Sequence, residues 1–179
     1  MSNFYSIGHS NLGLEEFIAL LKEANIQLLA DVRSFPRSRS NPAFNIESFP
    51  CDLRRVGIDY MHLRALGGRR NKQKNIEEHV NAMWRVSAFH NYADYALSDE
   101  FENAFMELVA LGRDRRIAIM CSEAVWWRCH RRIIVDYLLA NGQSVHHIMT
   151  RKQMTPATLT PGALITSAGK VVYPAGKEP

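Results

Sequence analysis

Residues 116–132 read Arg-Ile-Ala-Ile-Met-Cys-Ser-Glu-Ala-Val-Trp-Trp-Arg-Cys-His-Arg-Arg, and this stretch decides the fold. An apolar run typical of a buried strand ends on the thiol of Cys121 and the carboxylate of Glu123. After a short turn, Cys129-His130-Arg131 opens an amphipathic helix. In open α/β sheets, ligands bind beyond the carboxyl ends of the strands, against helix N-termini that favour anions. The stretch therefore predicts a strand, a site and a helix in succession.

The same alternation of strand and helix extends along the chain. Apolar runs typical of strands cover residues 4–9, 27–32, 59–63, 117–120 and 145–149. Helical spacing covers residues 14–24, 48–56, 99–111 and 129–140, and one or two helices are expected within 77–96. From Thr155 on, prolines and glycines break any pattern. We therefore predict an α/β fold: one domain over residues 1–179, a mainly parallel sheet with helices on both faces, and an extended C-terminal tail.

Composition places the chain among soluble globular proteins. It has 179 residues, of which 46% are hydrophobic and 22% charged, and it contains no apolar run long enough to span a membrane. The N-terminal residues lack the pattern of a signal peptide, and three cysteines are an odd number, so reduced thiols in a cytoplasm are expected. The net charge of +4 permits a nucleic acid or a phosphorylated ligand without requiring either.

Polar and reactive residues stand where the predicted strands end. Right-handed crossovers place the carboxyl ends of parallel strands along one edge of the sheet. The residues at or just beyond those ends are His9, Asp31, Arg33, Arg69, Arg70, Cys121 and Glu123. We expect a single concave pocket, lined by His9, Asp31, Arg33, Glu123 and His130.

Several runs also carry a family resemblance. They are Ile7-Gly8-His9-Ser10, the segment from Asp31 to Arg39, Leu66-Gly67-Gly68, and Cys121-x-Glu123 followed by Cys129-His130-Arg131. In this order they resemble the bacterial and archaeal domain of unknown function 488, over nearly the whole chain and including residues 159–163 and 172–174. The resemblance implies a fold and the location of a site, but no settled activity. The turn Ala124-Val125-Trp126-Trp127 differs from the charged, proline-containing turn of many members, which leaves the substrate open.

Cys121 is placed as a nucleophile would be, at a strand end that faces a helix N-terminus. Rhodaneses and cysteine phosphatases use this architecture. However, six residues separate Cys121 from Arg128, one more than the phosphatase spacing, and Trp126 and Trp127 replace the small residues that cradle a phosphate. The alternative is a buried structural cysteine. We expect the two indoles to bury Cys121, raise its pKa and slow its alkylation.

Acid–base pairs are a second possibility. Glu123 with His130, or Asp31 with His9, would pair a carboxylate with an imidazole, which fixes the tautomer and raises the basicity of the ring. The alternative is a buried ion-pair network that braces the loops.

A metal site is the third possibility. Cys121, Cys129 and His130, with His9, include the residue types that bind zinc. The seven residues between the two cysteines match no standard ligand spacing, so we expect no metal. A metal at Cys121, Cys129 and His130 is kept as the alternative.

Arginines from separate segments are predicted to converge on the site. They are Arg33, Arg37, Arg39, Arg69, Arg70 and Arg131. The planar guanidinium group suits bidentate contacts with phosphate. Trp126, Trp127 and Phe35 offer aromatic faces on which a base could stack. The alternative is that the two tryptophans cover a sheet edge or a dimer interface.

These observations predict a cytoplasmic enzyme acting on a phosphate-bearing substrate, with nucleotides and nucleic acids as candidates. The arginines and the two tryptophans would bind the substrate. The catalytic candidates are Cys121, Glu123, His130, His9 and Asp31. One alternative is a non-catalytic module that binds nucleic acid or a nucleotide, and another is sulfur transfer or redox chemistry at Cys121. No cofactor and no membrane association are expected, and a homodimer is a possible assembly.

Overall fold

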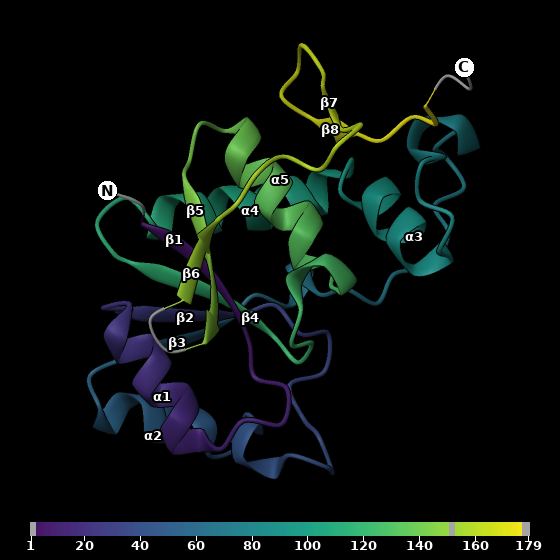
Figure 1. The fold of residues 1–179 in the computed structure, drawn as a ribbon. Helices are drawn as coiled ribbons and strands as arrows, with labels where there is room; N and C mark the ends of the chain where they lie inside the picture. Colours follow the sequence, from purple (N-terminus) through teal and green to yellow (C-terminus); the bar gives the residue numbers. More distant parts are fainter. Residues whose placement is uncertain (1–2, 151–152, 177–179) are drawn as a thin grey trace.

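The computed structural model describes residues 3–150 and 153–176 and contains a six-stranded sheet in the order β3-β2-β4-β1-β5-β6 (Figure 1). The strands are β1 Phe4–Gly8, β2 Leu28–Asp31, β3 Asp59–His62, β4 Ile117–Cys121, β5 Val145–Thr150 and β6 Gln153–Pro156. The first five pair in parallel, and only β6 runs antiparallel, against β5. The predicted mainly parallel sheet is confirmed.

Helices cover both faces of the sheet, as expected. They are α1 Leu14–Glu23, α2 Phe49–Arg55, α3 Ser87–Tyr95, α4 Asp99–Leu111 and α5 Arg131–Ala140, with 3-10 turns η1 Pro42–Phe44, η2 Arg64–Leu66, η3 Glu78–Asn81 and η4 Trp126–Arg128. Helices α1 and α2 lie on one face, and α4 and α5 on the other (Figure 1). Each layer has its own apolar cluster, around Phe17 and Phe44 on the first face and around Phe101 and Ile134 on the second.

The helix after β4 begins two residues later than its apolar spacing predicted. The 3-10 turn η4 and the extended backbone of Cys129 come first, and Arg131 is the first residue of α5. Cys129 and His130 therefore lie in the connection between β4 and α5. Their side chains are free to face the edge of the sheet.

The strand order creates a switch point between β1 and β4. The chain leaves β1 through α1 toward β2, whereas it leaves β4 through α5 toward β5, on the opposite side. Gly8 pairs with Cys121, so the two strands end level with each other. Ligand sites of open α/β sheets lie outside the carboxyl ends of strands at such a point. A ligand site is therefore expected next to the residues that follow Gly8 and Cys121.

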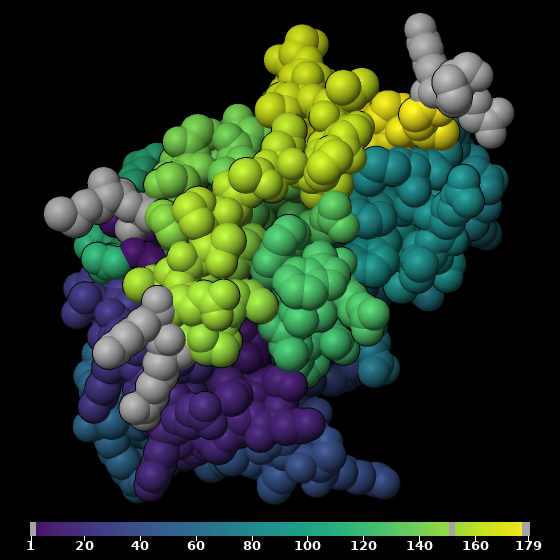
Figure 2. Space-filling model, in the orientation of Figure 1, coloured from purple at the N-terminus to yellow at the C-terminus, as the bar shows by residue number. Residues whose placement is uncertain are grey.

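The C-terminal segment wraps over the body, as expected, and adds strands that the sequence did not predict. Strand β6 extends the main sheet, and β7 Leu164–Ile165 pairs with β8 Val171–Val172. Figure 2 shows this segment spread over the surface. It is anchored by Tyr173, which is fully buried and donates a 2.8 Å hydrogen bond from its hydroxyl to Asp136 on α5. None of the helices in the described ranges has the length and apolarity that crossing a bilayer requires.

Candidate functional site

A cavity of about 380 Å³ opens at the switch point, beyond the ends of β1 and β4. Its lining includes His9, Arg33, Glu123 and His130, so four of the five side chains expected around one pocket are there. The fifth, Asp31, is fully buried behind Arg33. The loop that follows β2, the Gly68-Arg69 pair and the start of α3 form the other walls.

Asp31 and Arg33 form a buried ion pair at the end of β2. The carboxylate of Asp31 accepts hydrogen bonds from Nε of Arg33 at 2.9 Å, from Nη2 at 2.6 Å and from the hydroxyl of Tyr60 at 2.7 Å. Nη2 of Arg33 also donates to the carbonyl of Phe44 at 2.7 Å. The pair therefore ties the loop after β2 to the sheet, and the Asp31 carboxylate is fully engaged in doing so.

His9 is held as a neutral ring with both nitrogens engaged. Nη1 of Arg33 lies 3.3 Å from Nε2 of His9, and because arginine only donates, Nε2 accepts and Nδ1 donates to the carbonyl of Ser10. The ring stacks on Phe44 at a centroid distance of 4.4 Å. Burial, reinforced by the charge of Arg33, lowers the pKa of His9. The predicted acid–base pair of His9 with Asp31 is not formed, because Arg33 lies between them.

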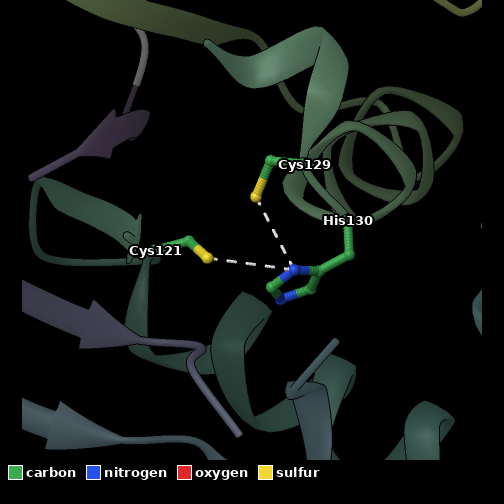
Figure 3. Close-up of side chains that lie close together, drawn as sticks. All are labelled: Cys121, Cys129 and His130. Atoms are coloured by element: carbon green, nitrogen blue, oxygen red, sulfur yellow. Dashed lines mark hydrogen bonds between the residues drawn. The ribbon is translucent and has the colours of Figure 1, made fainter. Parts of the chain in front are cut away.

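Cys121, Cys129 and His130 converge on the cavity (Figure 3). Nδ1 of His130 lies 4.0 Å from Sγ of Cys121 and 3.6 Å from Sγ of Cys129. Nε2 of the same ring lies 2.9 Å from the carbonyl of Val32, which can only accept, so Nε2 carries the proton and Nδ1 presents its lone pair to the two sulfurs. Tyr92 packs edge-to-face on the ring at 5.0 Å. His130 is thus fixed in position and in tautomer.

The two thiols have opposite electrostatic environments. The neighbouring Cys129 and burial together raise the pKa of Cys121 to about 12. Burial also raises the pKa of Cys129, but the neighbouring Cys121 and the guanidinium of Arg131 outweigh it and bring this pKa to about 6. The raised pKa expected for Cys121 is confirmed. Burial contributes to it, as expected, but the neighbouring Cys129 has the largest effect, and neither Trp126 nor Trp127 lines the cavity.

Arg131 holds the backbone next to the cavity in place. Its side chain is fully buried, donates from Nε to Sγ of Cys129 at 3.3 Å and from Nη2 to the carbonyl of Glu123 at 2.6 Å. It therefore braces the connection between β4 and α5 and does not line the cavity. Gly68 closes the opposite side, where a Cβ atom would lie 2.5 Å from Nδ1 of His130. The same Cβ atom would lie 2.7 Å from Cγ and 2.9 Å from Cε1 of the ring, so a side chain at this position would overlap the face of the imidazole.

The other predicted arginines separate into two groups. Arg37 and Arg69 line the cavity, although Arg37 is paired with Glu47. Arg39 is exposed outside the lining, and Arg70 donates to the carbonyls of Arg64, Ala65 and Gly67 and stacks on Tyr95. The predicted convergence on the cavity therefore holds for Arg33, Arg37 and Arg69 but not for Arg39 and Arg70. Sequence reasoning did not count Arg128 among the binding residues, yet it lines the cavity.

Trp126 packs against β5 and does not line the cavity. Its ring stacks on His147 at a centroid distance of 4.3 Å, and Trp127 is 46% exposed beside it. Nδ1 of His147 lies 2.7 Å from the hydroxyl of Ser6 on β1. Burial is the main reason that the pKa of His147 falls to about 4. This ring is consequently neutral in the folded protein at pH 7.

Replacing His147 by Gln is expected to reduce the acid sensitivity of folding. The pKa of His147 is about 4 when folded and about 6.5 when unfolded, so protonation of the unfolded state removes stability as the pH falls from about 6.5 to 4. The loss between pH 7 and pH 4.5, measured by urea unfolding, should be about 2–3 kcal/mol smaller in His147→Gln than in the wild type. The exposed His79→Gln is the control and should retain the wild-type pH dependence. Equal pH dependence in all three proteins would contradict this.

The structure also separates Glu123 from its predicted partner. His130 is occupied by the two thiols and the Val32 carbonyl, so the expected pair of Glu123 with His130 is not formed. The exposed Glu123 carboxylate lines the cavity on its own. Phe35, which is 62% exposed, lines the cavity near Arg69, whose guanidinium lies 5.4 Å from the centre of the Phe35 ring.

The structure is that of a three-layered α/β protein with a cavity at the switch point of its sheet. The family model described as domain of unknown function DUF488 matches residues 13–138, well over half of the chain, and the chain therefore belongs to this family. The matched range holds every cavity-lining residue except His9. It leaves out the N-terminal Ile7-Gly8-His9-Ser10 run and the C-terminal runs that contributed to the resemblance. No curated protein and no solved structure matches the chain significantly.

Proposed function

We propose that this protein is an enzyme that binds a phosphate-bearing substrate, of the nucleotide class, in the cavity at the switch point. The observation that carries the proposal is the convergence of reactive side chains on a basic cavity. Cys121, Cys129 and His130 have their ligand atoms within 4.8 Å of one another, and Arg69 and Arg128 line the same cavity. Within the described ranges, neither arginine forms an ion pair, so both guanidiniums are available to an anion.

The rest of the wall supports a planar substrate group. Phe35 is an exposed aromatic ring beside Arg69, an arrangement that suits a nucleobase stacked near its phosphate. Of the three aromatic residues suggested by the sequence for stacking a base, Phe35 lines the cavity and Trp126 and Trp127 do not. Arg33 adds positive potential, although its ion pair with Asp31 reduces what it contributes.

Glu123 is the candidate general acid or base. Its carboxylate is exposed and lines the cavity together with the reactive cluster. His9 and Asp31 are positioning residues in this proposal, because their polar atoms are engaged with Arg33 and its neighbours. The rival function, a non-catalytic nucleotide-binding module, would need the arginines and Phe35 but not Glu123.

The proposal is tested with a panel of phosphate monoesters and nucleotides, using calorimetry for binding and product analysis for turnover. Arg69→Met should weaken binding about tenfold or more, since it removes a charged hydrogen-bond donor. Glu123→Gln should keep the wild-type affinity and lower turnover by about 10²–10⁴-fold. Arg113→Met is the matched control, because Arg113 is exposed and precedes β4, at the opposite edge of the sheet.

The outcomes separate the two functions. Binding that depends on Arg69 but comes without turnover in the wild type would identify a binding module. Binding that is equally affected by Arg113→Met, or no binding to any phosphate compound, would overturn the anion site itself.

A further inference from the structure

We infer that Cys121, Cys129 and His130 form a zinc site with three protein ligands and a fourth position open to the cavity. This inference concerns the same cavity as the proposed function, but it does not depend on the nature of the substrate. It replaces the expectation from spacing alone, under which the seven residues between the cysteines argued against a metal.

The ligand atoms have the separations that a tetrahedral zinc ion requires. Zinc bonds of about 2.3 Å to sulfur and about 2.0–2.1 Å to nitrogen, at tetrahedral angles, place sulfur and nitrogen about 3.6 Å apart. Sγ of Cys129 lies 3.6 Å from Nδ1 of His130, and Sγ of Cys121 lies 4.0 Å from it. All three ligand atoms lie within 4.8 Å of one another and point toward a common centre (Figure 3). A shift of a few tenths of an ångström would bring Sγ of Cys121 to the same distance from Nδ1. The two sulfurs, which lie within 4.8 Å of each other, would close to about 3.8 Å around the ion.

The atoms around the ligands favour a metal over a simple hydrogen-bonded cluster. A histidine that binds a metal usually donates its other N–H to a carbonyl or carboxylate, which fixes the tautomer. His130 does this toward Val32, and its unprotonated Nδ1 faces two sulfurs instead of a strong donor. Arg131 donates to Sγ of Cys129 from its backbone N and its Nε, as outer-shell donors to metal-bound thiolates do.

The cavity supplies the open fourth position. Cys121, Cys129 and His130 all line it, so a bound zinc ion would face the cavity and could take a water molecule or a substrate atom. Three protein ligands and one exchangeable position are the arrangement of catalytic zinc sites, whereas structural sites are closed by four protein ligands. Two thiolates would balance the charge of the ion, which suits a site this deeply buried.

The experiment uses untagged full-length protein, stripped with a chelator and titrated with zinc against a chromophoric competitor. We expect one equivalent of zinc per chain. Cys121→Ser, Cys129→Ser and His130→Gln should each weaken binding more than about 100-fold, since each removes a ligand. Cys51→Ser is the matched control, because Cys51 is an exposed thiol on α2, and it should bind zinc like the wild type. Loss of binding in Cys51→Ser, or no stoichiometric zinc in the wild type, would overturn the site.

Cobalt substitution of the wild type keeps the test valid even if a variant does not fold. Co²⁺ should give a thiolate-to-cobalt charge-transfer band and the intense d–d bands of a tetrahedral site. Adding thiocyanate should shift the d–d bands if the fourth position is open. Absence of the charge-transfer band would overturn the ligand set, and d–d bands that do not respond to thiocyanate would overturn the open position. Neither result depends on turnover, so the zinc site and the anionic substrate can fail separately.

Discussion

Replacing Asp31 by Asn is expected to lower the free energy of unfolding by about 3–5 kcal/mol, because it leaves the buried guanidinium of Arg33 without its counter-charge. Asp31 is fully buried and Arg33 is only 5% exposed, so water cannot take over the lost interaction. Arg33 also holds the carbonyl of Phe44, and the loop after β2 should loosen with it. Urea unfolding followed by circular dichroism measures the change.

A second carboxylate on the same sheet provides the control. Asp59 pairs with Arg115 at 3.0 Å, but both side chains are exposed, so Asp59→Asn should cost less than about 1 kcal/mol. The double variant Asp31→Asn/Arg33→Met should recover part of the loss, because it removes the unpaired charge. Equal losses of stability in Asp31→Asn and Asp59→Asn would contradict the predicted contribution of the buried ion pair. A double variant that is less stable than Asp31→Asn would contradict it as well.

Replacing Gly8 by Ala is expected to destabilise the protein by about 3 kcal/mol and to disturb the cavity at the same time. A Cβ atom at this position would lie 1.8 Å from the carbonyl oxygen of Glu123 and 3.0 Å from Nη2 of Arg131. The oxygen belongs to the backbone and accepts the 2.6 Å hydrogen bond from Arg131, so relieving the clash requires the turn after β4 to shift. Thermal or urea unfolding reports the loss of stability.

Gly13→Ala is the matched control for this substitution. Gly13 has φ −69°, which any residue adopts, and nothing lies within 4 Å of the position of its Cβ atom. Gly13 is the N-cap of α1, where alanine is less favourable than glycine, so this variant should lose no more than about 1 kcal/mol of stability. A Gly8→Ala protein as stable as Gly13→Ala would show that the turn after β4 can move away from β1 at little cost.

Most of the fold could be predicted from the sequence because local patterns determine it. Strand β4 is an uninterrupted apolar run, and α4 has apolar side chains in register behind the N-cap Ser98, whose side chain accepts from the backbone N–H of Phe101. Strand β6 was missed because its residues are exposed and its partner β5 is what holds it in place. A strand formed by pairing alone leaves no periodic pattern in the sequence.

The cavity lies at the strand ends, as predicted, but several of the predicted side-chain pairings are not formed. Topology brings His9, Arg33 and Glu123 to one cavity, and topology can be inferred from alternating strands and helices. Whether an arginine faces the cavity depends on nearby acceptors that are distant in sequence. Arg131 donates hydrogen bonds to Glu123 and Cys129 instead of facing the cavity. Arg70 donates hydrogen bonds to backbone carbonyls that follow β3.

The residues of the proposed zinc site show the same limit of prediction from sequence. Spacing rules describe ligands on one short hairpin or one helix, whereas Cys121 ends β4 and Cys129 follows a 3-10 turn. The turn of residues 122–128 folds back, and both thiols come to lie close to Nδ1 of His130. The approach of the two thiols to His130 cannot be predicted from the residues between them.

Strand β6 also determines how the sheet ends. A sheet edge with a continuous row of free N–H groups can recruit a strand from another molecule and start aggregation. The backbone N–H of Ala157 donates inward to the carbonyl of Val145, so the nitrogen of the preceding residue faces outward. That residue is Pro156, which has no hydrogen to donate. A short strand that finishes on an outward-facing proline therefore gives an incoming strand little to pair with, and it protects the sheet from growing beyond a single molecule.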